Sequence, residues 1–291
     1  MKLQKIAYNI YRFFVPYDLD KEDLIETISS RPGAQGLLIG RSGSVEAKGV
    51  LYSRFKVIRP LLKVVMGFQE NRFAHLKQNA GFWDNSAEGV KKFGLLYNEC
   101  LKSVDVLASW RIEEIFFETK AKSIKLNDLD PFFSALPWTL VFKNKKILVI
   151  HPFISSFKKQ YEKGLNNIHN RPYFHGDEEM IFYRPCQGIG YNGSESWFCV
   201  LEKMNEDIAK IEFDIALIAA GAFGLPIASE IKKSGRVAIH MGGSLQILFG
   251  VKGRRWENDR RFDNIISKHF IRPMNSETPE GAVDVENSCY W

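Results

Sequence analysis

Short apolar runs recur along the chain, and a turn of glycine or polar residues and then a helical pattern follow each run. Four runs are continuous enough to predict buried strands, at 36–40, 146–150, 214–220 and 236–240. Helices are predicted directly after these strands, at 45–56, 154–163, 225–234 and from 245 onward. Continuous apolar strands are typical of a parallel sheet covered on both faces. The pattern therefore predicts an α/β fold with a mostly parallel sheet flanked by helices.

The remaining stretches give weaker patterns that are consistent with one domain over 1–291. Helical periodicity and many aromatic residues predict a helical insertion at about 61–110, while 112–133 is ambiguous and allows one strand. The polar and aromatic stretch 166–192 predicts loops with one strand near 180–183, and a helix is predicted at 196–211. We expect the apolar ending Cys289-Tyr290-Trp291 to dock on the body of the domain.

The first helical pattern, at 2–15, is amphipathic, and a second short helix is predicted at 18–29. Apolar residues of the first helix recur at helical spacing: Ile6, Ala7, Ile10, Phe13 and Phe14. Lys2, Lys5 and Arg12 lie between them. One interpretation is a helix packed on the domain. The other is a basic amphipathic helix that makes peripheral contact with an anionic membrane surface.

The composition indicates which cellular environment and which binding partners to expect. No apolar run approaches the ~20 residues of a membrane-spanning helix, and the first residues lack the pattern of a signal peptide. The four cysteines are scattered and form no CxxC pair, so we expect a reduced, cytoplasmic protein. The formal net charge of +6 favours anionic partners. Because the basic residues are not gathered and do not interleave with aromatics, nucleic acid is not a predicted partner.

The predicted fold indicates where a ligand would bind. In parallel sheets, ligands lie beyond the carboxyl ends of the strands, where helix N-termini offer free N–H groups that suit phosphate. Glycines allow close approach to the backbone. Four turns at these strand ends supply candidate ligand contacts: Arg41, Gly43, Ser44, His151, Ser155, Ser156, Gly221, Gly224, His240, Gly242 and Gly243.

Each candidate also has a purely structural interpretation. The glycines could serve tight turns alone, and His151 and His240 could be satisfied core residues. Glu46 could simply favour the dipole of its helix, or it could be a metal ligand or general base beside Arg41. The chain contains no GxSxG, HExxH or Walker A motif, which disfavours serine hydrolases, zinc proteases and P-loop NTPases.

The stretch Ile39-Gly40-Arg41-Ser42-Gly43-Ser44-Val45-Glu46 resembles the R-x-G-D-G-E stretch of glycosyltransferases of the GT-D fold. These enzymes are encoded in bacterial surface-polysaccharide and glycoprotein gene clusters. The resemblance is strongest to an uncharacterised branch of the group. It covers most of the chain and continues at 79–82, 105–107, 148–153 with Ser156, Gln160 and Tyr161, 240–243 with Gln246, 249–253, 255–256, 277–279 and 289–291.

The resemblance implies a Rossmann-like, GT-D type fold and a hexosyltransferase. Such an enzyme moves a sugar from a nucleotide-sugar donor to a saccharide acceptor, here a lipid-linked one, in polysaccharide biosynthesis at the inner face of the cell membrane. The resemblance adds Gln160 and Arg255 to the expected nucleotide-sugar contacts. Other interpretations remain open: a phosphoryl or pyruvyl transferase of the same pathway, or a non-catalytic nucleotide-binding partner that kept the fold.

In such transferases, the two acids of the first turn hold a divalent cation, Mn²⁺ or Mg²⁺, on the diphosphate. Here Ser44 stands at the position of the aspartate, and only Glu46 remains as catalytic residue and metal ligand. A single carboxylate can still hold such an ion, because phosphates and water supply the other ligands. Alternatively, Arg41, Lys252 or Arg255 could balance the charge of the leaving diphosphate.

Overall fold

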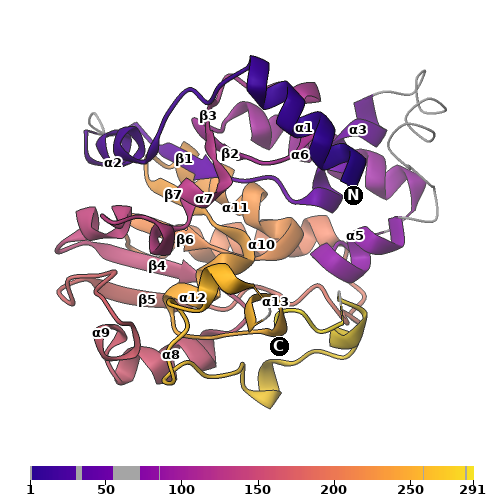
Figure 1. Cartoon of the computed structure of the whole chain (residues 1–291). Coiled ribbons are helices and arrows are strands. Elements are labelled where there is room, and N and C mark those ends of the chain that lie inside the picture. The colour runs from indigo at the N-terminus through magenta and orange to yellow at the C-terminus, as the bar shows by residue number, and fades with distance from the viewer. Residues whose placement is uncertain (1, 31–34, 55–72, 85, 258, 286) are drawn as a thin grey trace.

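A computed structural model describes residues 2–30, 35–54, 73–84, 86–257, 259–285 and 287–291 (Figure 1). Among these residues, seven parallel strands form one sheet in the order β3-β2-β1-β7-β6-β4-β5. The strands are β1 (Leu37–Gly40), β2 (Val106–Ser109), β3 (Lys122–Lys125), β4 (Lys146–Ile150), β5 (Glu179–Tyr183), β6 (Ile215–Ile218) and β7 (Val237–His240). The prediction of an α/β fold with a parallel sheet flanked by helices is confirmed.

The central strands are apolar throughout because both of their faces are covered. Successive side chains of a strand point to opposite faces. Leu38 and Leu148 join the core on one face, and their neighbours Ile39 and Val149 join the core on the other. All four side chains are fully buried. This explains why these strands show continuous apolar runs with no polar alternation.

Helices pack against both cores of the sheet. One core includes side chains of α3 (Ser44–Arg54), α5 (Phe73–Ala80), α6 (Ala87–Lys102), α10 (Trp197–Ala209) and α11 (Gly224–Lys233). The other includes side chains of α2 (Lys21–Ser29), α7 (Leu126–Leu129), α8 (Ile154–Glu162), α9 (Leu165–Ile168), α12 (Leu245–Leu248) and α13 (Arg254–Glu257). Helices that follow β1 and β6 therefore lie opposite those that follow β4 and β7, an arrangement that opens a crevice at the carboxyl edge.

Helix α1 (Lys2–Phe14) and several 3₁₀ helices are the remaining elements of the described residues. Helix α1 contacts the 3₁₀ helix η2 (Ile112–Phe116). The other 3₁₀ helices of the described residues are η3 (Pro131–Phe133), η4 (Trp138–Phe142), η5 (Gly221–Phe223), η6 (Gly242–Ser244), η7 (Arg260–Phe262), η8 (Asn275–Glu277) and η9 (Ala282–Asp284). The last residues dock on the body as expected, because Cys289 and Trp291 are buried. Within the described ranges, no helix is both long and apolar enough to cross a membrane.

The predicted helical insertion at 61–110 needs a correction. Residues 61–72 lie outside the described residues, and the stretch is helical in α5 and α6. Its end is not helical, because Val106–Ser109 forms β2 and pairs with β1 and β3. The predicted helix from 245 onward is short as well and ends at Leu248, just before Gly250, whose φ is 64°.

Candidate functional site

A cavity of about 200 Å³ lies where β1, β4, β6 and β7 end. It brings together most of the residues that the sequence singles out: Arg41, Gly43, Ser44, Glu46, His151, Gly221, His240, Gly242, Gly243 and Arg255. Ser155, Ser156, Gln160 and Gly224 are not among its lining residues. The carboxyl ends of parallel strands thus meet in one pocket, as the fold requires.

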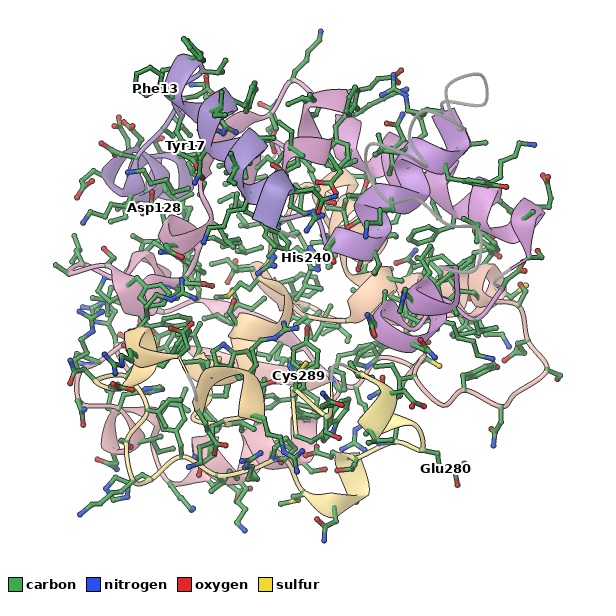
Figure 2. All side chains as sticks on the ribbon, turned by 45° about the vertical axis from the view of Figure 1, so that its right-hand side comes forward. Phe13, Tyr17, Asp128, His240, Glu280 and Cys289 are labelled. Carbon is green, nitrogen blue, oxygen red and sulfur yellow. The ribbon has the colours of Figure 1, made fainter. Side chains whose placement is uncertain are left out.

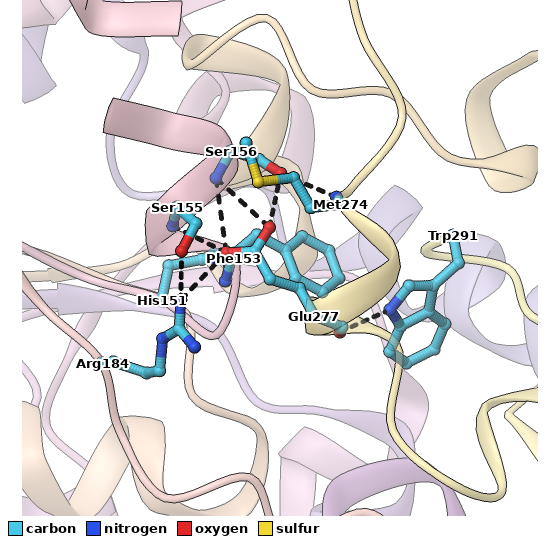
Figure 3. Close-up of polar contacts among 8 residues, drawn as sticks. All are labelled: His151, Phe153, Ser155, Ser156, Arg184, Met274, Glu277 and Trp291. Carbon is cyan, nitrogen blue, oxygen red and sulfur yellow. Dashed lines mark hydrogen bonds and ion pairs between the residues drawn. The ribbon is translucent and has the colours of Figure 1, made fainter. Parts of the chain in front are cut away.

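The N-terminus of α8 is occupied by a carboxylate of the chain itself (Figure 3). Glu277 accepts hydrogen bonds from the backbone N–H groups of Ser155, at 2.7 Å, and Ser156, at 3.2 Å. The Ser156 hydroxyl also donates to it, and Arg184 forms an ion pair with it at 3.3 Å. The positive end of this helix therefore stabilises Glu277 and is not open to a phosphate.

Gln160 and Gly224 make packing and hydrogen-bond contacts with other residues of the chain and do not line the cavity. The side-chain amide of Gln160 donates to the backbone carbonyls of Gly250, at 2.8 Å, and His269, at 3.0 Å. At Gly224, a Cβ atom would lie 2.4 Å from Nε2 of His240. Gly224 therefore leaves room for the His240 imidazole at the edge of the cavity.

Glu46 folds back over the N-terminus of its own helix, α3. A Cβ atom on Gly43 would lie 2.0 Å from Oε2 of Glu46, so only glycine admits this arrangement. Burial raises the pKa of Glu46, although hydrogen bonds from the backbone N–H groups of Glu46 and Val45 and the charge of Arg41 act in the opposite direction. Like α8, α3 therefore has its N-terminus filled by a carboxylate.

The two turns after β6 and β7 are different, because among the described residues neither an N-cap side chain nor a carboxylate from elsewhere in the chain bonds to their N–H groups. Each turn starts at a glycine in the left-handed region, with φ of 53° at Gly221 and 65° at Gly242. A Cβ atom on Gly243 would lie 2.4 Å from the Tyr290 ring. These two turns offer the cavity backbone that a ligand can approach closely.

Two arginines line the cavity, and each lies against an aromatic ring. The guanidinium carbon of Arg41 is 5.1 Å from the centre of the Trp110 ring. That of Arg255 is 4.5 Å from the Tyr290 ring, and Arg255 also donates to the Tyr290 hydroxyl at 2.8 Å. Among the described lining residues, Glu46 carries the only side-chain carboxylate, against the two arginines, so the side chains of the cavity favour an anionic ligand.

The two histidines at the strand ends are neutral, and their rings are opposite tautomers. Nδ1 of His151 accepts a hydrogen bond from the Phe153 N–H at 2.9 Å, so the ring proton is on Nε2. Nδ1 of His240 lies 3.1 Å from the Arg41 carbonyl, which can only accept, so Nε2 of His240 carries the lone pair. Burial lowers the pKa of His151 to about 3, and burial together with Arg41 lowers that of His240 to about 4.

The side chains present do not fit a resident divalent cation. In the described part of the chain, no group of three or more His, Cys, Asp or Glu side chains is arranged to hold a metal. The lone Glu46 carboxylate is bonded to backbone N–H groups and lies in the positive field of Arg41 and Arg111. A second positive charge at this carboxylate would be repelled by both arginines.

Several lining residues were not predicted. Trp110 follows β2, a strand that the sequence pattern does not reveal, and its indole N–H donates to the Ser42 carbonyl at 3.0 Å. Tyr290 and Trp291 come from the docked ending of the chain. Other aromatic residues are core and do not line the cavity: Phe82, Trp138 and Trp256. The advance signals for Tyr290 and Trp291 were their apolar character and the resemblance at 289–291.

A buried carboxylate, that of Glu114, binds the backbone N–H of Trp110. Glu114 accepts a hydrogen bond from the Trp110 N–H at 3.2 Å and another from the Ser109 hydroxyl. Burial nevertheless raises the pKa of Glu114 from 4.5 to about 7. Its protonation state therefore changes within the physiological pH range.

We expect Glu114→Gln to reduce the loss of stability that the protein shows between about pH 5 and about pH 8. Because the pKa of Glu114 is higher in the folded chain than in the unfolded chain, the folded state holds the proton more tightly. This contribution is fully present below the unfolded pKa and is lost as the pH rises through about 7. Urea unfolding measures this loss as the change in the free energy of unfolding between about pH 5 and about pH 8. The change should differ between the two proteins by on the order of 2 kcal/mol.

The exposed Glu99→Gln is the control for this measurement, since Glu99 pairs only at the surface with Lys102. Its free energy of unfolding should follow the wild-type pH dependence. An identical pH dependence in wild type and Glu114→Gln would contradict the raised pKa.

Comparisons of the chain with models of known protein families, with curated proteins and with solved structures found no match. Since a fold by itself does not determine an activity, function must be inferred from the residues of the cavity.

Proposed function

We propose that this chain is a glycosyltransferase that moves a sugar from a nucleotide-sugar donor to a saccharide acceptor. One observation carries the proposal: the cavity combines Arg41 and Arg255, the uncapped glycine turns and the buried Glu46 at the carboxyl edge of a parallel sheet. This combination suits a ligand that carries a diphosphate. The resemblance of Ile39–Glu46 to the R-x-G-D-G-E stretch supports the same activity.

In the proposed reaction, the donor diphosphate lies between the two arginines and the turn at Gly242-Gly243. The acceptor hydroxyl attacks the anomeric carbon, the bond from that carbon to the phosphate oxygen breaks, and the nucleoside diphosphate leaves. Arg41 and Arg255 stabilise the charge that develops on the leaving oxygen. Glu46 accepts the hydroxyl proton, and because burial raises its pKa, Glu46 is a stronger base than an ordinary carboxylate.

The proposal assigns the countercharge to arginines because the donor set around Glu46 does not fit a metal. Ser44 stands where the related transferases have an aspartate, which leaves one carboxylate where they have two. Arginine forms paired, charge-assisted hydrogen bonds with phosphate and needs no further ligands. We therefore expect donor binding that persists without a divalent cation.

The acceptor in this proposal is a lipid-linked saccharide of surface-polysaccharide biosynthesis at the inner face of the cell membrane. Trp110, Tyr290 and Trp291 give the cavity an aromatic wall. Aromatic side chains provide broad apolar surface with few polar groups, which suits the apolar face of a sugar ring.

Titration calorimetry with a panel of nucleoside diphosphates and nucleotide sugars, in EDTA and in Mn²⁺, tests the proposal. We expect at least one donor to bind equally in both conditions. Glu46→Gln should keep binding within about threefold and should lose transfer, because the amide cannot accept the proton. If no nucleotide binds, the proposal is wrong.

Two other outcomes would identify the alternatives. Nucleotide binding without any transfer or donor hydrolysis in the wild type would indicate a non-catalytic partner, in agreement with Ser44 in place of the aspartate. Transfer of a phosphoryl or pyruvyl group in place of the sugar would keep the anion site and change the reaction class.

A further inference from the structure

Helix α1 turns its apolar side away from the rest of the chain. Ile6, Ile10, Phe13 and Phe14 recur at the spacing of one helix face, here called the α1 apolar face. Ile6 and Ile10 are more than half exposed, and Phe13 and Phe14 are 83% and 75% exposed. Figure 2 shows Phe13 at the periphery of the molecule. In an ordinary surface helix the apolar stripe faces the core, so this inverted helix presents an interaction surface.

Polar contacts with the body fix the helix in this orientation. The Tyr8 hydroxyl lies 3.0 Å from Oγ of Ser109, and Arg12 donates to the same oxygen at 2.6 Å. Arg12 also donates to Oγ of Ser123 at 3.2 Å, and Gln4 donates to Glu113. The α1 apolar face is therefore held in place before any partner binds, which lowers the entropic cost of binding.

The charge of the helix identifies the partner. Helix α1 contains Lys2, Lys5 and Arg12 and no acidic residue, and the chain carries a formal net charge of +6. A second copy would bring two cationic helices together, whereas an anionic lipid surface would attract them. We propose that the α1 apolar face docks on an anionic lipid bilayer, with Phe13 and Phe14 inserted among the lipids.

Docking would bring the carboxyl edge of the sheet close to the bilayer. Helix α1 contacts Ser109 and Glu113, which lie on either side of Trp110 in the sequence. The Trp110 ring lines the cavity and lies against Arg41. A lipid-linked acceptor would then meet the cavity at the membrane surface, although the docking itself does not depend on the glycosyltransferase activity.

Flotation with lipid vesicles tests the docking. We expect the wild-type chain to float with phosphatidylglycerol vesicles, to bind phosphatidylcholine vesicles far more weakly, and to lose binding as salt increases. The double variant Phe13→Ser/Phe14→Ser should bind at least about tenfold more weakly. Even part of the transfer free energy of two phenylalanine rings exceeds the roughly 1.4 kcal/mol that corresponds to this factor.

The matched control is Leu136→Ser/Val283→Ser, which removes two other exposed apolar side chains, 59% and 67% exposed. It should bind vesicles like the wild type, and Lys5→Glu should bind more weakly. Circular dichroism and thermal unfolding verify that each variant is folded. The proposal would be overturned if the wild type bound both vesicle types equally. It would also be overturned if Phe13→Ser/Phe14→Ser bound anionic vesicles as strongly as the wild type.

Light scattering distinguishes membrane docking from self-association through the α1 apolar face. If the wild type does not bind vesicles but forms a dimer that Phe13→Ser/Phe14→Ser converts to a monomer, the α1 apolar face is an interface between copies, and the membrane proposal is wrong. Nucleotide binding measured on the same variants keeps this test separate from the proposed function. The α1 variants should bind nucleotide like the wild type whether or not the membrane proposal holds.

Discussion

Replacing Arg41 with methionine should weaken nucleoside diphosphate binding by about a hundredfold, because hydrogen bonds from a charged donor contribute roughly 1.5–3 kcal/mol each. Methionine keeps much of the length and apolar volume of the arginine stem, so the loss would report the guanidinium, which lies over the Trp110 ring. Arg41→Lys should recover only part of the affinity, since an ammonium group cannot form the paired contact. Calorimetry with the tightest-binding nucleoside diphosphate measures the change.

Arg255 offers a control from the neighbouring position in the sequence. Arg255→Met should weaken binding as Arg41→Met does, because Arg255 lines the cavity. Arg254→Met removes the same charge from α13, but Arg254 does not line the cavity and bonds instead to the Asn287 carbonyl. If Arg254→Met and Arg255→Met weaken binding equally, only the overall charge matters, and the assignment of the site is wrong.

The sequence predicts the central strands well because each is a continuous apolar run covered on both faces. It does not predict β2, because Val106–Ser109 follows α6 almost directly and continues a stretch with a helical pattern. A short apolar run of this kind does not distinguish a strand from the end of a buried helix. The order of the strands could not be predicted either, since β1 pairs with β7 from the distant end of the chain.

The candidate site was predictable to the extent that it depends on where parallel strands end. The turns at Arg41, His151, Gly221 and Gly242 meet in one cavity for this reason. What could not be predicted is which helix N-termini remain open. That depends on carboxylates placed by the fold, above all Glu277, which reaches α8 from a distant segment.

These filled N-termini change how the chain would bind an anion. With α3 and α8 already carrying a carboxylate, the positive charge in the cavity comes mainly from Arg41 and Arg255. Aromatic rings hold both arginines in place, which reduces the side-chain entropy lost on binding. Affinity in this site should therefore depend more on these two side chains than on helix dipoles.

Glu277→Ala should destabilise the protein by about 3 kcal/mol, because it leaves the buried Ser156 N–H and the partly buried Ser155 N–H without their acceptor and Arg184 without its ion-pair partner. The variant should also bind nucleotide more weakly. The indole N–H of Trp291 donates to the Glu277 carbonyl at 3.0 Å, and the Trp291 ring lines the cavity. Loosening this segment would therefore loosen one wall of the site.

Urea unfolding and calorimetry measure the two effects separately, and the exposed Glu280→Ala from the same segment is the matched control. Glu280→Ala should change the free energy of unfolding by less than about 0.5 kcal/mol. Glu277→Gln should fall between the two, because the amide oxygen can still accept one hydrogen bond but the charge at the positive end of α8 is lost. If Glu277→Ala and Glu280→Ala were equally stable, the carboxylate would not fix the C-terminal segment. The Trp291 wall of the cavity would then have to be held by other contacts, such as the hydrogen bond from Arg272 to the Trp291 carbonyl.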